Sequence, residues 1–316
     1  MYFSNKLKNE NMKTIFKLFI LITFVSACKT DKKSPEKTPE TEVTEIKVTP
    51  KLAFEINGMT HCESVVYDNK RGVYYASLIG NREDGDGSIA KVAGDGTVID
   101  TMFIKGLNDP KGIAITADKL YVSDVTILVE ADLNTGKVIH EHTNDNTQFL
   151  NDVSIADDGK VYVSDTRKSS IFVLNTDGSF TEWLNSEALE HPNGLLNIGN
   201  DMYVAAWGNV VGEGDDAKQS GNFLKIDMNT KEITKVSKNT LGNLDGVQVY
   251  DENSFLISAW DSGKVMKITK SGDVEDILTV GRSVGDILYV PSTKVLGLPM
   301  NIQSQLLLYQ FQETDK

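Results

Sequence analysis

The stretch from Asn151 to Asp165 reads NDVSIADDGKVYVSD, and it decides the fold. It consists of a short apolar run, a turn rich in Asp and Gly, and a second run rich in Val and Tyr, which is typical of a β-hairpin. The same pattern returns as ESVVYDNKRGVYYAS from Glu63, KGIAITADKLYVSD from Lys111, NGLLNIGNDMYVAA from Asn193, DGVQVYDENSFLIS from Asp245 and, in a degenerate form, GDILYVPSTKVLGL from Gly285. The chain therefore contains an internal repeat, which indicates a repeat architecture.

A third strand, and usually a fourth, follows each hairpin. In the quoted copy these strands are IFVLN and FTEWL. The copies begin roughly 40 to 50 residues apart, which is the spacing of four-stranded β-propeller blades. The sixth copy ends after three strands, and residues 51–56 (KLAFEI) form a strand with no blade of its own. We therefore expect an all-β, six-bladed β-propeller over residues 51–316, with four antiparallel strands per blade. The N-terminal strand closes the last blade and so removes an open sheet edge.

Polar residues stand at one equivalent position of the repeat, the start of each innermost strand. They are Glu63, Lys111, Asn151, Asn193 and Asp245, with Gly285 in the degenerate copy. Equivalent positions of a propeller surround its central channel, so we expect these side chains to converge. Two carboxylates and two amide carbonyls are donors that Ca²⁺ binds, and the absence of His and Cys argues against zinc and copper. The alternative is a water-filled polar channel, which Lys111 favours because a cation competes with a metal.

These residues and their neighbours resemble the senescence-marker-protein, gluconolactonase and luciferin-regenerating-enzyme family over essentially the whole domain. The resemblance rests on Glu63, on Asn151, on Asn193 within His191-Pro192-Asn193-Gly194, and on Asp245 within Leu244-Asp245-Gly246. Family members hold one divalent metal in a six-bladed propeller through a Glu, two Asn and an Asp. The resemblance therefore implies that the metal ligands are Glu63, Asn151, Asn193 and Asp245. It implies Ca²⁺ or another divalent cation such as Mg²⁺, Mn²⁺ or Zn²⁺, with Asp245 also acting as catalytic base or nucleophile. The alternative for Asp245 is a ligand without a catalytic role.

Two positions depart from the family pattern. Lactonases of the family often have an Arg two residues before the first Asn, where this chain has Phe149, and their Glu-Gly-Pro motif is here Glu63-Ser64-Val65. The fold and the metal site can carry over without the substrate, because fold does not fix function. We expect a metal-dependent hydrolase of a lactone or a related ester. The alternative is a non-catalytic propeller that binds a ligand or a partner, which Phe149 and Lys111 favour.

Residues that end the second strand of each blade return to the face on which the inner strands begin. Asp124, Asp165, Trp207, Trp260 and Asp261 occupy such positions, and insertions at 81–87 and 208–221 lie in the same loops. Together with Lys111 and Phe149 these residues are our predicted substrate contacts. Two Trp beside acids suit a sugar-like or ring-shaped small molecule. The alternative for each residue is packing between blades.

The first residues have the layout of a signal peptide. A basic segment precedes an apolar run at 18–25, which is too short to span a bilayer. Val25-Ser26-Ala27-Cys28 resembles a lipobox, so we expect residues 1–28 to be a lipoprotein signal peptide and Cys28 to carry a lipid. The alternative is an ordinary cleaved signal. Residues 29–50 are rich in charge and Pro and are expected to be a disordered tether.

The composition limits the partners of the chain. Its net charge of −13 repels nucleic acid. If Cys28 carries a lipid, only Cys62 remains and no disulfide can form. We expect a monomer that acts on a small molecule and is held in the cell envelope, at the outer membrane, by its lipid anchor alone. The sequence leaves open which face of the membrane carries it.

Overall fold

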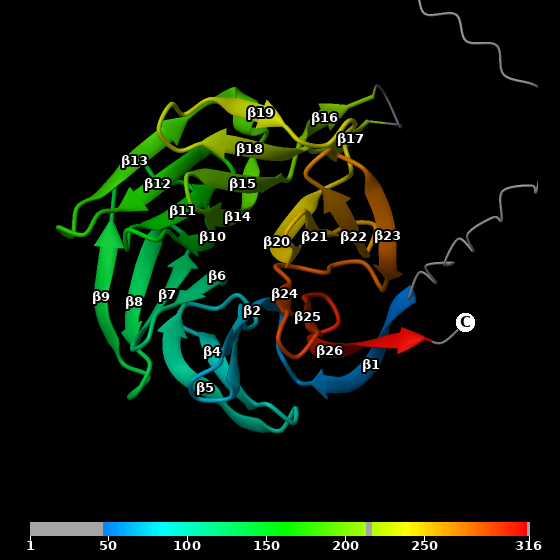
Figure 1. Cartoon of the computed structure of the whole chain (residues 1–316). Helices are drawn as coiled ribbons and strands as arrows, with labels where there is room; N and C mark the ends of the chain where they lie inside the picture. The colour runs from blue at the N-terminus through cyan, green and yellow to red at the C-terminus, as the bar shows by residue number, and fades with distance from the viewer. Residues whose placement is uncertain (1–46, 213–216, 315–316) are drawn as a thin grey trace, which may run out of the picture. The chain divides into compact units, whose positions relative to one another are not determined.

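The computed structural model describes residues 47–212 and 217–314, which form six four-stranded antiparallel sheets and one two-stranded ribbon. The six sheets stand around a central axis (Figure 1). The described part of the chain is therefore the all-β, six-bladed propeller that the repeat predicts.

In blades one to five the innermost strand comes first in the chain, whereas in blade six the outermost strand does. Blade one consists of β2 (Cys62–Asp68), β3 (Val73–Leu78), β4 (Gly87–Ala93) and β5 (Val98–Leu107), and blade two of β6 (Pro110–Ile115), β7 (Lys119–Asp124), β8 (Ile127–Asp132) and β9 (Val138–Thr143). Blade three consists of β10 (Leu150–Ile155), β11 (Val161–Asp165), β12 (Ser170–Leu174) and β13 (Phe180–Asn185), and blade four of β14 (Pro192–Ile198), β15 (Asp201–Ala206), β18 (Phe223–Asp227) and β19 (Ile233–Lys235). Blade five consists of β20 (Leu244–Asp251), β21 (Ser254–Ala259), β22 (Lys264–Thr269) and β23 (Val274–Thr279), and blade six of β24 (Leu288–Val290), β25 (Val295–Met300), β26 (Gln305–Thr314) and β1 (Lys47–Asn57).

Two smaller elements interrupt this order. The ribbon of β16 (Asn209–Val211) and β17 (Lys218–Ser220) is the insertion of blade four, and the 3-10 turn η1 (Glu187–Leu189) joins blades three and four. The inner strands contact one another in chain order from β2 to β24, and β24 returns to β2. The inner strands thus form a closed ring, and the two ends of the chain meet in blade six.

Strand β1 closes the ring, as predicted from the strand at 51–56 that has no blade of its own. It pairs antiparallel with β26, with Ile56 opposite Leu306 and Leu52 opposite Tyr309. The strand is longer than the predicted 51–56, because pairing continues outward to Lys47. Residues 47–50 therefore belong to the propeller and not to the predicted tether at 29–50.

The predicted signal peptide, the lipidation site Cys28 and the rest of the tether lie outside the described residues. Among the residues that are described, no helix has the length and apolar character needed to cross a bilayer.

The core lies between neighbouring blades, because each sheet buries side chains on both faces against the next sheet. The cluster between blades six and one shows how closure is stabilised: Ile56 from β1 packs with Leu306 and Leu308 from β26 and with Val65 from β2. Cys62, the one described cysteine, is buried in the same cluster. Burial raises the pKa of its thiol far above the ordinary value, so it behaves as a small apolar residue.

Ile56 and Leu52 on β1 allow a direct test of ring closure. Ile56 is 6% exposed and Leu52 is 42% exposed. Ile56→Ala should lower the free energy of unfolding by about 2–5 kcal/mol, because it leaves a cavity between the first and last blades. Leu52→Ala should cost less than about 1 kcal/mol. Urea unfolding of both variants checks this, and equal losses would contradict the role of β1 in closure.

Candidate functional site

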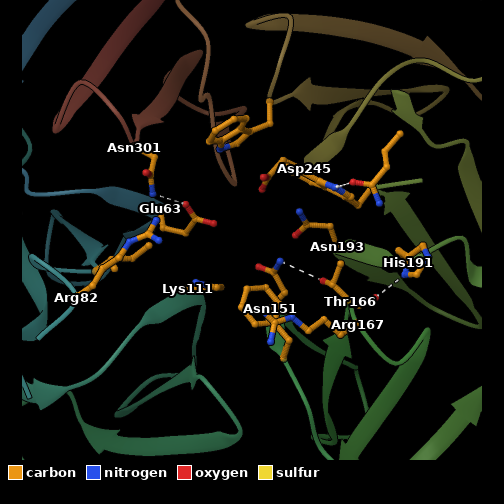
Figure 2. Close-up of a pocket in the computed structure, with 15 residues that line it drawn as sticks. Glu63, Arg82, Lys111, Asn151, Thr166, Arg167, His191, Asn193, Asp245 and Asn301 are labelled. Atoms are coloured by element: carbon orange, nitrogen blue, oxygen red, sulfur yellow. Dashed lines mark hydrogen bonds between the residues drawn. The ribbon is translucent and has the colours of Figure 1, made fainter. Parts of the chain in front are cut away.

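A cavity of about 470 Å³ opens on the face where the inner strands begin (Figure 2). Five of the predicted ring residues line it: Glu63, Lys111, Asn151, Asn193 and Asp245. Most of the other lining residues follow second strands, as strand direction predicts. These other residues are Ile79, Arg82, Phe149, Thr166, Arg167, His191, Trp207, Gln219, Trp260 and Asn301. The structure therefore brings together side chains from all six blades at one place.

A shift of register at the start of the inner strands frees the ring residues from regular pairing. The pairing of first and second strands skips from Cys62 to Val65 in blade one and from Leu150 to Val153 in blade three. Similar shifts occur in blades two, four and five. The ring residue lies inside each shift. A bulge of this kind re-aims a side chain, which is why these five residues can face the cavity.

Neighbouring blades approach so closely at the ring that the residue after each ring position has little room. A Cβ atom added to Gly194 would lie 2.1 Å from the carbonyl oxygen of Asp245 in the next blade. Where the residue is not Gly, its side chain bonds across the gap: Asp152 Oδ2 accepts the amide of Leu195 at 2.6 Å. The Gly that follows the ring position at 112, 194 and 246 thus reflects the short distance between blades.

Serine hydroxyls on second strands fix the same region. Ser164 Oγ accepts the amide of Asp152 in its own blade at 2.9 Å and donates to the carbonyl of Asn193 in the next blade at 2.7 Å. Ser258 makes the same two bonds between blades five and six, at 2.8 Å each. The backbone beneath the ring is therefore hydrogen-bonded from blade to blade.

The side-chain nitrogen of the ring amide Asn151 is engaged. Asn151 Nδ2 donates to Thr166 Oγ1 at 3.2 Å, and Thr166 in turn donates to the carbonyl of Pro192 at 2.8 Å. The second ring amide, Asn193, is close enough to Asp245 to oppose the rise in the pKa of that carboxyl. An amide whose nitrogen donates in this way has its carbonyl oxygen left to accept or to bind a cation.

Asn301 completes the ring where the sixth repeat is degenerate. Its Nδ2 donates to Glu63 Oε2 at 2.9 Å, and its Oδ1 lies 3.3 Å from His61 Nδ1. Gly285, at the ring position of this blade, has no side chain to offer. Asn301 was not among the predicted site residues, although it directly follows a second strand, as Trp207 and Trp260 do.

The carboxylates of the ring are short of positive charge. Burial raises the pKa of Asp245 well above its usual range, and the nearby carboxylates of Glu63, Asp286 and Asp152 raise it further. Burial also raises the pKa of Glu63, against the opposing effects of Lys111, of the hydrogen bond from Asn301 and of Arg82. Asp245 Oδ1 is buried and has no hydrogen-bond partner among the described residues. A buried carboxylate oxygen without a hydrogen-bond partner is a candidate ligand for a cation.

The available donors determine which ions fit. They are the carboxylate oxygens of Glu63 and Asp245 and the amide oxygens of Asn151 and Asn193, which suit a hard cation such as Ca²⁺. Within 47–212 and 217–314, no group of three or more His, Cys, Asp or Glu side chains is placed to hold a metal. A metal at this site would therefore need the amide oxygens.

The two predicted Trp contacts lie at the cavity. Their ring centroids are 6.0 Å apart, and Trp207 Nε1 donates to Gln219 Oε1 at 3.0 Å. Asp261, predicted beside Trp260, does not line the cavity. It pairs with Arg282 at 2.8 Å instead.

Asp124 and Asp165 are buried at the ends of second strands and are not brought into the cavity either. Asp124 Oδ1 accepts the amides of Asn108 at 3.0 Å and Asp109 at 2.6 Å, and Asp165 Oδ1 accepts the amide of Phe149 at 3.1 Å. Both carboxylates hold the segment that enters an inner strand. We expected these two carboxylates to contact substrate, but they position the ring residues instead.

Phe149 lines the cavity and carries two cations on its ring. Lys111 Nζ lies 4.9 Å and Arg167 Cζ 4.6 Å from its centroid, which is cation–π distance. Lys111 also donates to Asp109 at 2.7 Å. Arg167 had no signal in the sequence, because its position depends on the ring of Phe149 in a preceding segment.

No protein-family model and no curated protein matches this chain, but solved structures do. A gluconolactonase from Xanthomonas campestris matches with a TM-score of 0.63 at 14% sequence identity, over 85% of this chain and 99% of that chain. A catalytically inactive variant of virginiamycin B lyase from Staphylococcus aureus, solved with quinupristin, matches with a TM-score of 0.58 at 11% identity, over 84% of this chain and 99% of that chain. The structural neighbours thus include the gluconolactonases that the sequence resembles, and at these identities the likeness shows a shared fold.

The bond between Asn151 and Thr166 can be tested through stability. Thr166→Val keeps the shape of the side chain but leaves Asn151 Nδ2 and the carbonyl of Pro192 without their partner. The free energy of unfolding should fall by about 1–3 kcal/mol. Thr181→Val, at an exposed position of β13, is the matched control and should change it by less than about 0.5 kcal/mol. Equal effects in urea unfolding would show that the bond contributes nothing.

Proposed function

We propose that this chain is a metal-dependent hydrolase that opens a lactone or a related ester in the cavity described above. The observation that carries the proposal is the buried Asp245 Oδ1, which has no hydrogen-bond partner among the described residues and faces a set of oxygen donors. The shared fold with a gluconolactonase supports the same reaction class.

Glu63, Asn151, Asn193 and Asp245 are the proposed metal ligands. Their oxygen-only donor set favours Ca²⁺, with Mg²⁺, Mn²⁺ or Zn²⁺ as alternatives. A divalent cation bound there would supply Lewis acidity toward the ester carbonyl. Asn301 holds Glu63 in place through its hydrogen bond of 2.9 Å.

Asp245 is the proposed general base. Its carboxylate takes a proton from the water that attacks the ester carbonyl, the ester C–O bond breaks, and the proton passes to the leaving oxygen. One water is consumed, and the product is a hydroxy acid. The indole rings of Trp207 and Trp260 line one side of the cavity and suit the ring of a sugar-like substrate.

A second candidate is a binding propeller that holds a ligand or a partner on the same face without turning it over. Phe149 favours it, because lactonases of the resembled family often have an Arg at that place. Lys111 favours it as well, because its ammonium lines the same cavity as the proposed metal ligands.

Asp245→Asn separates the two candidates. The substitution keeps an oxygen ligand and removes the base, so turnover of lactones should fall by about 10²–10⁴-fold. Calorimetry should still detect Ca²⁺ binding to the variant, with lower affinity. Hydrolysis of lactones, esters and phosphotriesters is measured with and without chelator.

Asp157→Asn is the matched control, because Asp157 is exposed on a turn between β10 and β11, away from the cavity. It should leave both activity and Ca²⁺ binding unchanged. If the wild type binds no divalent cation, the proposed metal site is wrong. If it hydrolyses nothing at any metal loading but binds a ligand that Asp245→Asn does not affect, the binding function holds.

We further propose that the propeller is lipid-anchored at the outer membrane through Cys28, on the strength of the lipobox-like Val25-Ser26-Ala27-Cys28. In a bacterial host, Cys28→Ser should move the protein from the membrane fraction to the soluble fraction and abolish labelling by a fatty-acid analogue. Cys62→Ser is the control and should leave both unchanged. An unlabelled wild type that fractionates as soluble would contradict the anchor.

A further inference from the structure

The arginines of the chain fall into two groups. Arg71 pairs with Asp68 at 2.7 Å, and Arg282 pairs with Asp261 at 2.8 Å. The other two, Arg82 and Arg167, both line the cavity. Neither makes an ion pair with any residue in the ranges that the structure describes. We call Arg82 and Arg167 the cavity arginines (Figure 2).

Arg167 is held in place without a carboxylate partner. Its guanidinium lies 4.6 Å from the centroid of the Phe149 ring. The two segments that carry Arg167 and Phe149 are joined by one buried carboxylate, because Asp165 Oδ1 accepts the amides of both Phe149 and Lys168, each at 3.1 Å. Stacking of this kind orients a guanidinium while leaving its edge N–H groups free to donate.

Arg82 stands on the loop between β3 and β4 with φ of 67°, a left-handed conformation that is uncommon for a long side chain. The loop is tied by Asp86, whose carboxylate accepts the amides of Asn81 at 2.6 Å and Glu83 at 3.2 Å. The strained backbone is therefore maintained by specific bonds, as is common where a side chain must be aimed.

Among the side chains that line the cavity, the charges do not cancel once the proposed dication is present; the buried carboxylates of Asp152 and Asp286 do not line it. The dication balances Glu63 and Asp245, and Lys111 is balanced by Asp109 at 2.7 Å. The two guanidinium charges then remain. They remain in a protein whose net charge is −13, so the side chains that line the cavity would carry the opposite sign to the chain as a whole. Guanidinium groups bind phosphate and carboxylate through paired, charge-assisted hydrogen bonds.

We propose that the substrate carries a negatively charged group, a phosphate or a carboxylate, which the cavity arginines bind while the ester lies at the ring. This rests on the proposed hydrolase function and names its substrate class. Hydrolysis consumes one water at the ester and leaves the charged group unchanged. Phe149, which departs from the family pattern, acts here as the platform for Arg167.

The test uses the full chain loaded with Ca²⁺ and three lactones of similar shape: δ-gluconolactone, its 6-phosphate, and a glucarolactone with a free carboxylate. At least one anionic lactone should exceed the neutral one in kcat/KM by about 10- to 100-fold. The better of the two anionic lactones identifies the charged group. Arg82→Gln and Arg167→Gln should each remove most of that preference, because they should lower kcat/KM for the anionic lactone far more than for the neutral one.

Calorimetry of the three hydrolysis products measures binding without turnover. The affinities of the wild type should follow the same order as kcat/KM for the three lactones, and the cavity-arginine variants should lose affinity for the anionic products. Arg71→Gln is the matched control and should change neither the preference in kcat/KM nor the binding of the products. Hydrolysis of the neutral lactone at a rate equal to both anionic ones, or equal losses on all three in the cavity-arginine variants, would overturn the inference and leave the hydrolase function standing. Arginine-dependent binding of anions without any hydrolysis would support the inference and overturn the hydrolase. If the protein shows no hydrolysis and no anion binding, both the inference and the hydrolase function are overturned.

Discussion

Pairing of β1 with β26 is the constraint on which the rest of the molecule depends. The ten residues Gln305–Thr314 present a full strand edge, and only the opposite end of the chain supplies its partner. Closure brings blade six against blade one, and with it Asn301 against Glu63. It also brings Asp286 within reach of Ser64, whose hydroxyl donates to it at 2.6 Å. The cavity thus contains residues whose proximity exists only because the ring is closed.

Charged groups of both signs gather around that ring. Asp152 and Asp286 are buried next to the ring positions and do not line the cavity, and burial raises the pKa of Asp286 to about 7. At the ring itself stand Glu63 and Asp245. Three cationic side chains, Lys111, Arg82 and Arg167, line the same cavity. The carboxylates favour a cation and the cationic side chains favour an anion, so the lining of the cavity offers partners to both signs of charge.

The fold and the ring were predictable because both depend on repetition. A strand pattern that recurs along the chain predicts blades, and an equivalent position in each blade predicts convergence, so Glu63 and Asp245 were found although they lie far apart in sequence. Residues that act through single local contacts could not be found in this way. Asn301 belongs to a degenerate copy, and Arg167 depends on stacking against Phe149. Asp124 was misjudged, since acidic character at a strand end does not reveal whether the carboxylate faces solvent or the backbone amides of its own loop.

The division of the cavity between strands and loops has a consequence for how such a protein can change. Ring residues are fixed by bulges, by close blade contacts and by serine bonds, so replacing one disturbs its neighbours in two blades. Arg82 and Trp260 stand on loops outside the pairing of the sheets, and substitutions there leave the ladders untouched. In the proposed function, the residues that hold the metal and the residues that select the substrate therefore lie on separate parts of the chain. A related protein can acquire a new substrate through substitutions in these loops alone. This gives a physical reason why proteins with very different sequences can share this fold.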